Sequence, residues 1–405
     1  MRLCGFCLGG EWRAIIYSMN DHIFRGSNEI IEYRELEKKL KREEPLRIKH
    51  GIDPTGDRIH IGHASTLRKL KHFQDMGHQV VLIVGSFTAQ IGDSSDKSSE
   101  RQTLSKQDVE ANMRDYQKQL ARVIDIEKAE VRFNHEWFES MELSQWLELN
   151  QLFSVAQMIE RENFAQRFQA GKRIGLQEFQ YPIMQAYDSV AVEADVEIGG
   201  TDQLFNMLGG RQVQKHYGQP IQDVITYELL CADDGSKMSK SWENCIWVDD
   251  APSDMYGKVM RIDDDMLTHY FTLATDVENA EIKDIHQRLE GGENPRDVKQ
   301  RLAREIVSIY HGETAARRAE DGFVRQFQNK ELPEDIPETP LSRREWELVD
   351  LLVATELAGS KSQARRLVGQ GGIRINGDQI QKDTITVADG DVLQAGKRHF
   401  RKIRL

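Results

Sequence analysis

Cysteine, proline and long apolar runs are all scarce in this chain of 405 residues. Its four cysteines are too few and too scattered to form the disulfide framework of a small secreted domain. The longest apolar run, residues 80–84, is far shorter than the roughly 20 residues that a membrane-spanning helix requires. The N-terminal stretch lacks the apolar core of a secretory signal, so we expect a cytoplasmic protein without a membrane segment.

Metal and redox chemistry have one weak candidate, the CxxC pair of Cys4 and Cys7. No second Cys/His pair follows at zinc-ligand spacing, and no strand pattern precedes the pair as in a redox site. We therefore predict no metal site in the protein itself.

Charge is distributed unevenly along the chain. The net charge of −12 argues against a protein that coats nucleic acid indiscriminately. Residues 361–405, however, contain ten Lys or Arg and four Asp, a balance of +6 that leaves −18 on the rest of the chain. Because this segment also has helical patterns and an Asn376-Gly377 hairpin signal, we expect a folded basic module that contacts phosphates rather than a solvated tail.

Strand and helix patterns alternate over the first part of the chain. We expect a surface helix at residues 29–44, which ends before Pro45, and then two strands, 46–52 and 78–86, with a helix between them. Further strands are expected at 129–135, 194–200 and 222–230. This pattern predicts an α/β fold with a Rossmann-like parallel sheet and a helical insertion, and with ligands bound at the carboxyl ends of the strands.

The sequence divides into five predicted segments. Strand signals fade after residue 249, and residues 331–340 hold three of the nine prolines among acidic residues, as in a stiffened linker. We predict an N-terminal extension and helix at 1–45, the Rossmann-like domain at 46–248, an α-helical domain at 249–330, a linker at 331–342 and a small α+β domain at 343–405.

The first candidate site is the sequence HIGH at residues 60–63, after the first strand and a turn-rich loop. His60 and His63 lack the i,i+4 spacing and the intervening Glu of a metalloprotease pair. An isolated histidine usually has a structural role. Here the start of a helix, the small Gly62 and the hydroxyl of Thr55 together favour a bound phosphate chain.

The second candidate is the loop at residues 233–241, in which Lys237 and Lys240 lie among Gly and Ser. Alone, this segment would be a solvated basic loop. Together with HIGH, its ammonium groups indicate a site for a polyphosphate.

A third pattern is formed by Tyr181, Gln185 and Asp188, which recur at i, i+4 and i+7. On a helix they would form one polar stripe, and most such stripes face solvent. The residues between them are largely apolar and leave no obvious wet face, which favours a stripe that faces a ligand.

HIGH followed by KMSKS at residues 237–241, on alternating strands and helices, resembles the class I aminoacyl-tRNA synthetases. Four stretches are similar to the tyrosyl-tRNA synthetase family in particular: residues 51–63, 91–101, 181–189 and 199–206. The resemblance runs from about residue 46 through the C-terminal module, which is similar to the S4-like RNA-binding domain of bacterial members.

The resemblance implies a homodimeric ligase that forms tyrosyl-adenylate from L-tyrosine and ATP with Mg²⁺, and then transfers tyrosine to tRNA(Tyr). The implied catalytic residues are Thr55, His60, His63, Lys97, Arg101, Lys237 and Lys240. The implied tyrosine contacts are Asp93, Tyr181, Gln185, Asp188 and Gln203. The implied ATP contacts are Gly51, Asp53, Gly62, Gly200, Asp202, Met238 and Ser239. The implied RNA contacts are Lys361, Arg365, Arg366 and Arg374.

The chain departs from the family pattern at two places. Lys49 occupies a position where many members have a tyrosine that helps bind the phenol, which leaves Asp188 as the principal phenol partner. Residues 92–96 read GDSSD where members often have GDPSG, so this loop lacks the usual proline and second glycine.

Three other functions remain open from the sequence. Tryptophanyl-tRNA synthetases share the fold, but they typically lack an S4-like tail, and the polar stripe suits a phenol better than an indole. A non-catalytic RNA-binding relative would have no need of intact HIGH and KMSKS sequences. A ligase that works without tRNA would have no need of the basic C-terminal module.

Overall fold

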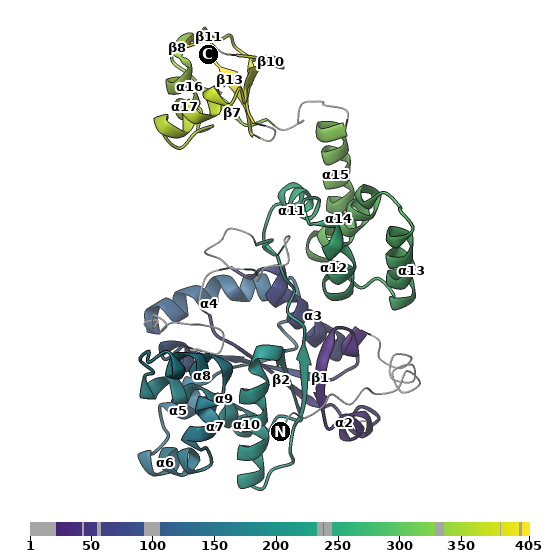
Figure 1. Cartoon of the computed structure of the whole chain (residues 1–405), viewed down its shortest axis with the longest axis vertical. Helices are drawn as coiled ribbons and strands as arrows, with labels where there is room; N and C mark the ends of the chain where they lie inside the picture. Colours follow the sequence, from purple (N-terminus) through teal and green to yellow (C-terminus); the bar gives the residue numbers. More distant parts are fainter. Residues whose placement is uncertain are drawn as a thin grey trace. The chain divides into compact units, whose positions relative to one another are not determined.

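The computed structural model describes residues 22–42, 44–54, 58–92, 106–232, 238, 245–328, 336–380, 382–396 and 399–405. The chain forms two compact units, one that ends at Asp321 and one that begins at Gly322. Figure 1 shows the helices and strands of both units. No helix in these described ranges is both long enough and apolar enough to cross a membrane.

The first unit contains a six-stranded sheet. Its strands are β1 (Ser27–Ile31), β2 (Arg47–Ile52), β3 (Gln79–Val84), β4 (Glu130–Phe133), β5 (Val196–Gly200) and β6 (Asp223–Tyr227). They lie in the order β1-β6-β5-β2-β3-β4, and β1 runs antiparallel to β6 while all other neighbours are parallel. Residues 80–84 of β3 are buried on both faces, as expected of a central parallel strand. The predicted α/β fold is therefore confirmed.

Helices cover both faces of this sheet. The helices of this region are α2 (Tyr33–Leu40), α3 (Ile61–Asp75), the short η1 (Thr88–Gln90), α4 (Lys106–Leu120), α5 (His135–Phe138), α6 (Leu143–Gln151), α7 (Val155–Ile159), α8 (Glu162–Gln169), η2 (Leu176–Phe179), α9 (Gln180–Ala191), η3 (Thr201–Gln203) and α10 (Leu204–His216). Helices α3 and α4 lie on one face, and α9 and α10 lie on the other (Figure 1). The predicted helical insertion corresponds to α5–α8, between β4 and α9.

The order of the strands fixes where a ligand can bind. The chain runs from β2 through β3 to β4 and then returns to β5, which lies on the other side of β2. The direction of winding therefore reverses between β2 and β5. In open α/β sheets this reversal leaves a crevice at the carboxyl ends of the two strands, and ligands bind there.

The N-terminal helix is shorter than the sequence predicts. Residues 27–31 form β1, in which Ile30 pairs with Ile225 of β6, and α2 begins only at Tyr33. Glu32 separates the two elements with a left-handed φ of 60°. The prediction of helix from residue 29 is wrong because pairing at the open edge of the sheet outweighs the helical spacing of the apolar residues.

A helical region follows the sheet and extends past the end of the first unit at Asp321, in agreement with the helical pattern beyond residue 249. Its elements are α11 (Pro252–Val259), η5 (Asp264–Met266), α12 (Leu267–Ala274), α13 (Asn279–Glu290), α14 (Pro295–His311) and α15 (Glu313–Phe323), followed by a π-helical turn (Val324–Gln328). Tyr256, Tyr270 and Phe271 are fully buried and anchor α11 and α12 in its core.

The second unit is a small α+β fold. Its elements are β7 (Glu338–Pro340), β8 (Glu345–Glu347), α16 (Leu348–Ala354), α17 (Lys361–Gly369), β9 (Ile373–Ile375), β10 (Asp378–Gln379), β11 (Thr384–Thr386), β12 (Val392–Ala395) and β13 (His399–Arg404). Five strands form one sheet in the order β10-β9-β12-β13-β7, and β8 pairs with β11. Leu351, Ile373 and Leu393 are fully buried in its core.

Two expectations for this unit can be compared with its backbone. Asn376 and Gly377 have φ values of 51° and 94° and connect the antiparallel strands β9 and β10, which confirms the predicted hairpin. Residues 338–340, which the sequence places in the linker, form β7 and pair in parallel with β13. Residues 331–335 of the linker lie outside the described part of the chain.

Candidate active site

A cavity of about 270 Å³ lies at the carboxyl ends of β2 and β5, where the winding of the sheet reverses. It brings together a large share of the residues predicted from the sequence. The predicted residues that line it are Gly51, Asp53, His60, Gly62, His63, Tyr181, Gln185, Asp188, Gly200, Asp202, Gln203 and Met238. The predicted residues Thr55, Asp93, Lys97, Arg101, Lys237, Ser239 and Lys240 lie outside the described part of the chain.

The HIGH sequence forms the N-terminal end of α3. His60 is the N-cap residue, with extended backbone angles, and its ring stacks on that of His63 with 4.0 Å between the centroids. A Cβ atom on Gly62 would lie 2.9 Å from Nδ1 of His60 and 3.1 Å from the carbonyl oxygen of Leu230, so the close packing requires glycine. The first turn of α3 therefore presents two imidazoles and the positive end of the helix dipole at the cavity, which suits an anion.

The second motif meets the first at this cavity. Met238, from the KMSKS sequence, is buried and lines the same cavity as His60 and His63. The segment after KMSKS pairs with the HIGH segment, because Ile61 N–H donates to the carbonyl of Ile246 at 2.9 Å and Val248 N–H donates to the carbonyl of Ile59 at 3.0 Å. Leu230, before this loop, and Ile246, after it, thus both lie beside the start of α3.

The polar stripe of α9 faces the cavity and not solvent. Tyr181 and Asp188 are buried, and both line the cavity with Gln185. The Tyr181 hydroxyl donates to Oδ2 of Asp53 at 2.9 Å, and Thr88 Oγ1 donates to Oδ1 of the same carboxylate at 3.1 Å. Asp53 therefore fixes the position of Tyr181 at the end of β2.

Asp188 is a buried carboxyl group in an uncommon electrostatic setting. Burial raises the pKa of Asp188 to about 7, while the positive charge of Lys49 and hydrogen bonds from Trp137 and Asn134 act in the opposite direction. The indole Nε1 of Trp137 donates to Oδ1 at 2.9 Å. The group is therefore an oriented hydrogen-bond acceptor that titrates near neutral pH.

Glycines form the β5 side of the cavity. A Cβ atom on Gly200 would lie 2.6 Å from Oδ1 of Asp202 and 2.9 Å from Cδ2 of Leu229. At the end of β3, a Cβ atom on Gly85 would lie 1.8 Å from Oδ1 of Asp53. Glycine at these two positions therefore lets the side chains of Asp202 and Asp53 lie close to the backbone at the edge of the cavity.

Comparison with known proteins identifies the family. Residues 41–328 match the model of the class I tRNA synthetases of the tryptophan and tyrosine group, and residues 328–400 match the model of the tyrosine–tRNA ligase SYY-like C-terminal domain. The chain belongs to the class I tRNA synthetases. The family inferred from HIGH and KMSKS is thus confirmed.

Individual relatives agree with this family. The synthetase is 46% identical to the tyrosine–tRNA ligase of Thermotoga maritima, over 93% of this chain and 94% of that protein. It is 45% identical to tyrosine–tRNA ligase 2 of Clostridium acetobutylicum, over 94% of this chain and 97% of that protein. Among solved structures, a C-terminally truncated mitochondrial tyrosyl-tRNA synthetase of Aspergillus nidulans has the same fold, with a TM-score of 0.64 at 22% identity over 76% of this chain and 93% of that one.

Some residues of the synthetase's cavity were not predicted from the sequence. Glu197 and Thr88 line the cavity, and Trp137 binds Asp188 from α5. The sequence could have pointed to Gly85, because this glycine directly follows a buried strand. It could not have pointed to Trp137 or Glu197, since their roles depend on which elements lie side by side in the fold.

The predicted RNA contacts of the synthetase lie in its second unit. Lys361, Arg365 and Arg366 are exposed on α17, and Arg374 is exposed on β9. Lys361 Nζ pairs with Oδ1 of Asp350 at 2.7 Å, so part of its charge is neutralised. Arg365 and Arg366 thus form the more strongly basic part of this helix.

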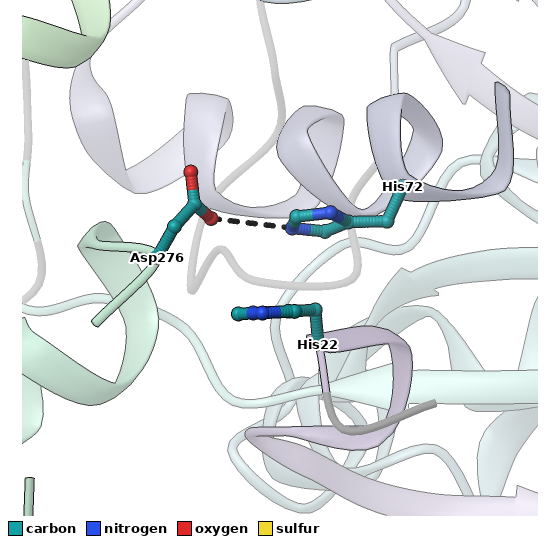
Figure 2. Close-up of side chains that lie close together, drawn as sticks. All are labelled: His22, His72 and Asp276. Atoms are coloured by element: carbon teal, nitrogen blue, oxygen red, sulfur yellow. Dashed lines mark ion pairs between the residues drawn. The ribbon is translucent and has the colours of Figure 1, made fainter. Parts of the chain in front are cut away.

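A separate cluster of His22, His72 and Asp276 has the composition of a metal site (Figure 2). His22 and His72 stack with 4.9 Å between ring centroids, and Nε2 of His72 lies 3.3 Å from Oδ1 of Asp276. Two arginines already act on these groups: Arg25 Nη2 lies 2.9 Å from Nδ1 of His22, and Arg68 forms an ion pair with Asp276. Their positive charges oppose a cation, so we interpret the cluster as an ion-paired joint between α3 and the segment after α12.

Proposed function

We propose that this synthetase is a tyrosine–tRNA ligase, which activates L-tyrosine with ATP and transfers the tyrosyl group to tRNA(Tyr). The observation that carries this proposal is one cavity in which the HIGH histidines and Met238 of the second motif face a buried carboxyl group on α9. The names of relatives more than 40% identical over nearly the whole chain support the same reaction.

The α9 side of the cavity would hold the amino acid. Asp188 would accept the hydrogen bond of the phenol hydroxyl, while Tyr181 and Gln185, with Asp93, would hold the α-amino group. Gln203 lines the cavity where the substrate carboxylate would lie. Phenylalanine has no hydroxyl to satisfy Asp188, and a buried polar group without a partner costs free energy, so the wrong substrate is penalised.

The first step would need no nucleophile from the protein. An oxygen of the tyrosine carboxylate attacks the α-phosphorus of ATP, the bond to the bridging oxygen breaks, and pyrophosphate leaves with the bonding electrons. Catalysis then consists of positioning and of stabilising negative charge on the phosphates. His60, His63 and the N-terminal end of α3 would supply part of this stabilisation. Further donors would be Thr55, Lys97, Arg101, Lys237 and Lys240.

The β5 side of the cavity would hold the nucleotide. Gly51, Gly62 and Gly200 would allow the adenosine to lie against the backbone, and Asp202 would accept from a ribose hydroxyl. Asp53 would act through its hydrogen bond to Tyr181, and Met238 and Ser239 would contact the nucleotide from the second motif.

Magnesium would arrive with ATP. The carboxylates of Asp53, Asp188 and Glu197 each accept a hydrogen bond from another side chain of the protein, so they do not form a ready cage for the ion. This setting fits an ion that enters with the phosphates of the nucleotide. When bound, Mg²⁺ would neutralise charge on those phosphates.

The second step would use the basic second unit. A hydroxyl of the terminal adenosine of tRNA attacks the carbonyl carbon of the adenylate, and AMP leaves. Arg365 and Arg366 on α17, with Lys361 and Arg374, would contact the RNA backbone. We place this reaction in the cytoplasm.

Exposed apolar side chains support a homodimer. The described part of the chain exposes several large apolar residues between positions 143 and 176, from α6 to η2, of which Leu143 and Leu176 are 72% and 79% exposed. The others in this segment are Leu147, Val155 and Phe168. Several exposed large apolar side chains within one segment of a chain are typical of an interface. Sedimentation of the full chain should give the mass of two copies, and a single-copy mass at micromolar concentration would contradict the dimer.

Pyrophosphate exchange tests the proposed reaction. The full chain is assayed for ATP/pyrophosphate exchange with each of the twenty amino acids. We expect exchange with tyrosine far above all others, followed by charging of tRNA(Tyr). Exchange with another amino acid, or none with tyrosine, would overturn the proposal.

A further inference from the structure

Lys49 is a charged residue inside the core of the sheet. Its side chain is 0% exposed, and it lies in β2 directly opposite Glu197 of β5. Its ammonium group donates to Oε1 of Glu197 at 2.9 Å, to Oγ of Ser189 at 2.7 Å and to the backbone carbonyl of Gln185 at 3.0 Å. Each of the three protons of the ammonium group therefore has an acceptor.

Glu197 links this buried cation to the cavity. Its side chain is 2% exposed and lines the cavity, whereas Lys49 is not among the lining residues. Besides Lys49, Glu197 Oε1 accepts from Nε2 of Gln185 at 3.4 Å, and Oε2 accepts from Oγ of Ser189 at 3.2 Å. The ion pair thus holds the turn of α9 from Gln185 to Ser189, and Asp188 lies within that turn.

Lys49 also acts on Asp188 through its charge. Among the neighbours that act on the pKa of Asp188, Lys49 is the strongest influence that favours the ionised form, and Glu197 favours the protonated form. His50, which also lines the cavity, has its pKa lowered by burial and is therefore neutral. Trp137 and Asn134 contribute hydrogen bonds without charge.

We propose that Lys49 is a positioning residue for substrate selection. With Glu197 it orients the α9 turn, and its buried positive charge lets Asp188 receive the phenol hydroxyl as a carboxylate. Lys49 thereby supports the choice of tyrosine over phenylalanine without touching either amino acid. This inference rests on the proposed function.

The alternative is an ion pair that only stabilises the fold. The two possibilities differ in how the titration of Asp188 responds when one charge of the pair is removed. Loss of the cation in Lys49→Met makes the Asp188 carboxylate harder to form, while loss of the anion in Glu197→Gln makes it easier. A purely structural pair would not move the titration of Asp188 in opposite directions.

The experiment measures kcat/KM in pyrophosphate exchange for tyrosine, and for phenylalanine at high concentration, from pH 6 to 9. For Lys49→Met we expect the acid limb of the tyrosine profile to move to higher pH. We also expect the preference for tyrosine to fall roughly tenfold, which corresponds to a rise of about one unit in the pKa of Asp188. For Glu197→Gln we expect the acid limb to move to lower pH.

Two further variants separate this effect from loss of stability. Lys39→Met removes another largely buried lysine, which pairs with Asp223 at 3.0 Å at the amino end of β6, away from the cavity. It should lower the melting temperature and leave the tyrosine preference and the acid limb unchanged. If Lys49→Met does not fold, the double variant Lys49→Met/Glu197→Gln removes both charges of the pair, so neither remains buried without its partner. The double variant should still show a lower preference for tyrosine.

Equal losses for tyrosine and phenylalanine with an unmoved acid limb, or shifts of the same sign in both single variants, would overturn the inference. Failure of the proposed function is distinct, because the unmodified chain itself would then show no exchange dependent on tyrosine.

Discussion

The two sides of the cavity are built on different physical principles. On the α9 side, side chains are held by other side chains: Tyr181 by Asp53, Asp188 by Trp137, and Lys49 by Glu197. On the side where α3 and β5 meet the cavity, the lining combines the imidazoles of His60 and His63 with glycines at 62 and 200. The first side has its polar groups fixed by other side chains, and the second presents two imidazoles at the positive end of a helix.

This difference corresponds to two tasks. A site that must distinguish a hydroxyl from a hydrogen benefits from a rigid, buried acceptor, because a missing partner then costs the most. A site that must stabilise a changing charge on phosphates benefits from oriented donors and close access. Changes on the α9 side should therefore affect the selection of tyrosine over phenylalanine. Changes on the side of α3 and β5 should affect the rate of adenylate formation.

The largest expected effect lies on the phosphate side. His60→Ala removes an imidazole at the start of α3, and we expect formation of tyrosyl-adenylate to slow by about 100- to 1,000-fold, the scale of losing one oriented donor. Tyrosine binding should stay within about twofold, because the α9 side is intact. Single-turnover kinetics and equilibrium binding measure the two quantities separately. Equal losses in both would break the proposed division of tasks.

A change on the tyrosine side should have the converse result. Asp188→Ala removes the phenol acceptor, and we expect the ratio of kcat/KM for tyrosine to that for phenylalanine to fall roughly 10- to 100-fold. Exchange kinetics with both amino acids provide the ratio. An unchanged ratio would show that another group selects the phenol.

The pH dependence of the unmodified protein sharpens the same point. Because burial raises the pKa of Asp188 to about 7, the ionised acceptor is lost as pH falls through that value, and we expect KM for tyrosine to rise by up to about tenfold per pH unit below it. The stability of the folded protein depends on pH in the opposite direction. The contribution of Asp188 to stability is fully present below the ordinary pKa of an aspartate and is lost as pH rises through about 7. KM for tyrosine, measured at pH 6 and at pH 8, checks the expected rise. In the control variant Asp188→Asn, KM should be the same at both pH values.

The smallest expected effect lies outside the cavity. Arg365→Ala/Arg366→Ala should raise KM for tRNA several-fold and lower the slope of log affinity against log salt by about 0.7–0.9 for each phosphate that the variant no longer neutralises. Pyrophosphate exchange should not change. Lys361→Ala is a matched control with a weaker effect, because Asp350 already pairs with that lysine. A fall in exchange for the double variant would contradict the separation of the second unit from adenylate formation.

Much of the site could be predicted from local patterns. The start of α3 was predicted because a helix after a strand and a turn-rich loop presents N–H groups to an anion, and the α9 stripe was predicted from its spacing. The pairing of Lys49 with Glu197 could not be predicted, because it depends on β5 returning beside β2 in one particular register. The same limit applies to β1, which the open edge of β6 converts from expected helix to strand.

The most direct test is a crystal structure with a non-hydrolysable tyrosyl-adenylate analogue. We expect its phenol oxygen to lie within hydrogen-bonding distance of Asp188, its adenosine to lie against Gly62 and Gly200, and its phosphate mimic to lie at the start of α3 beside His60 and His63. An analogue with its phenol away from Asp188, or with its adenosine outside this cavity, would contradict the assignment of the two sides.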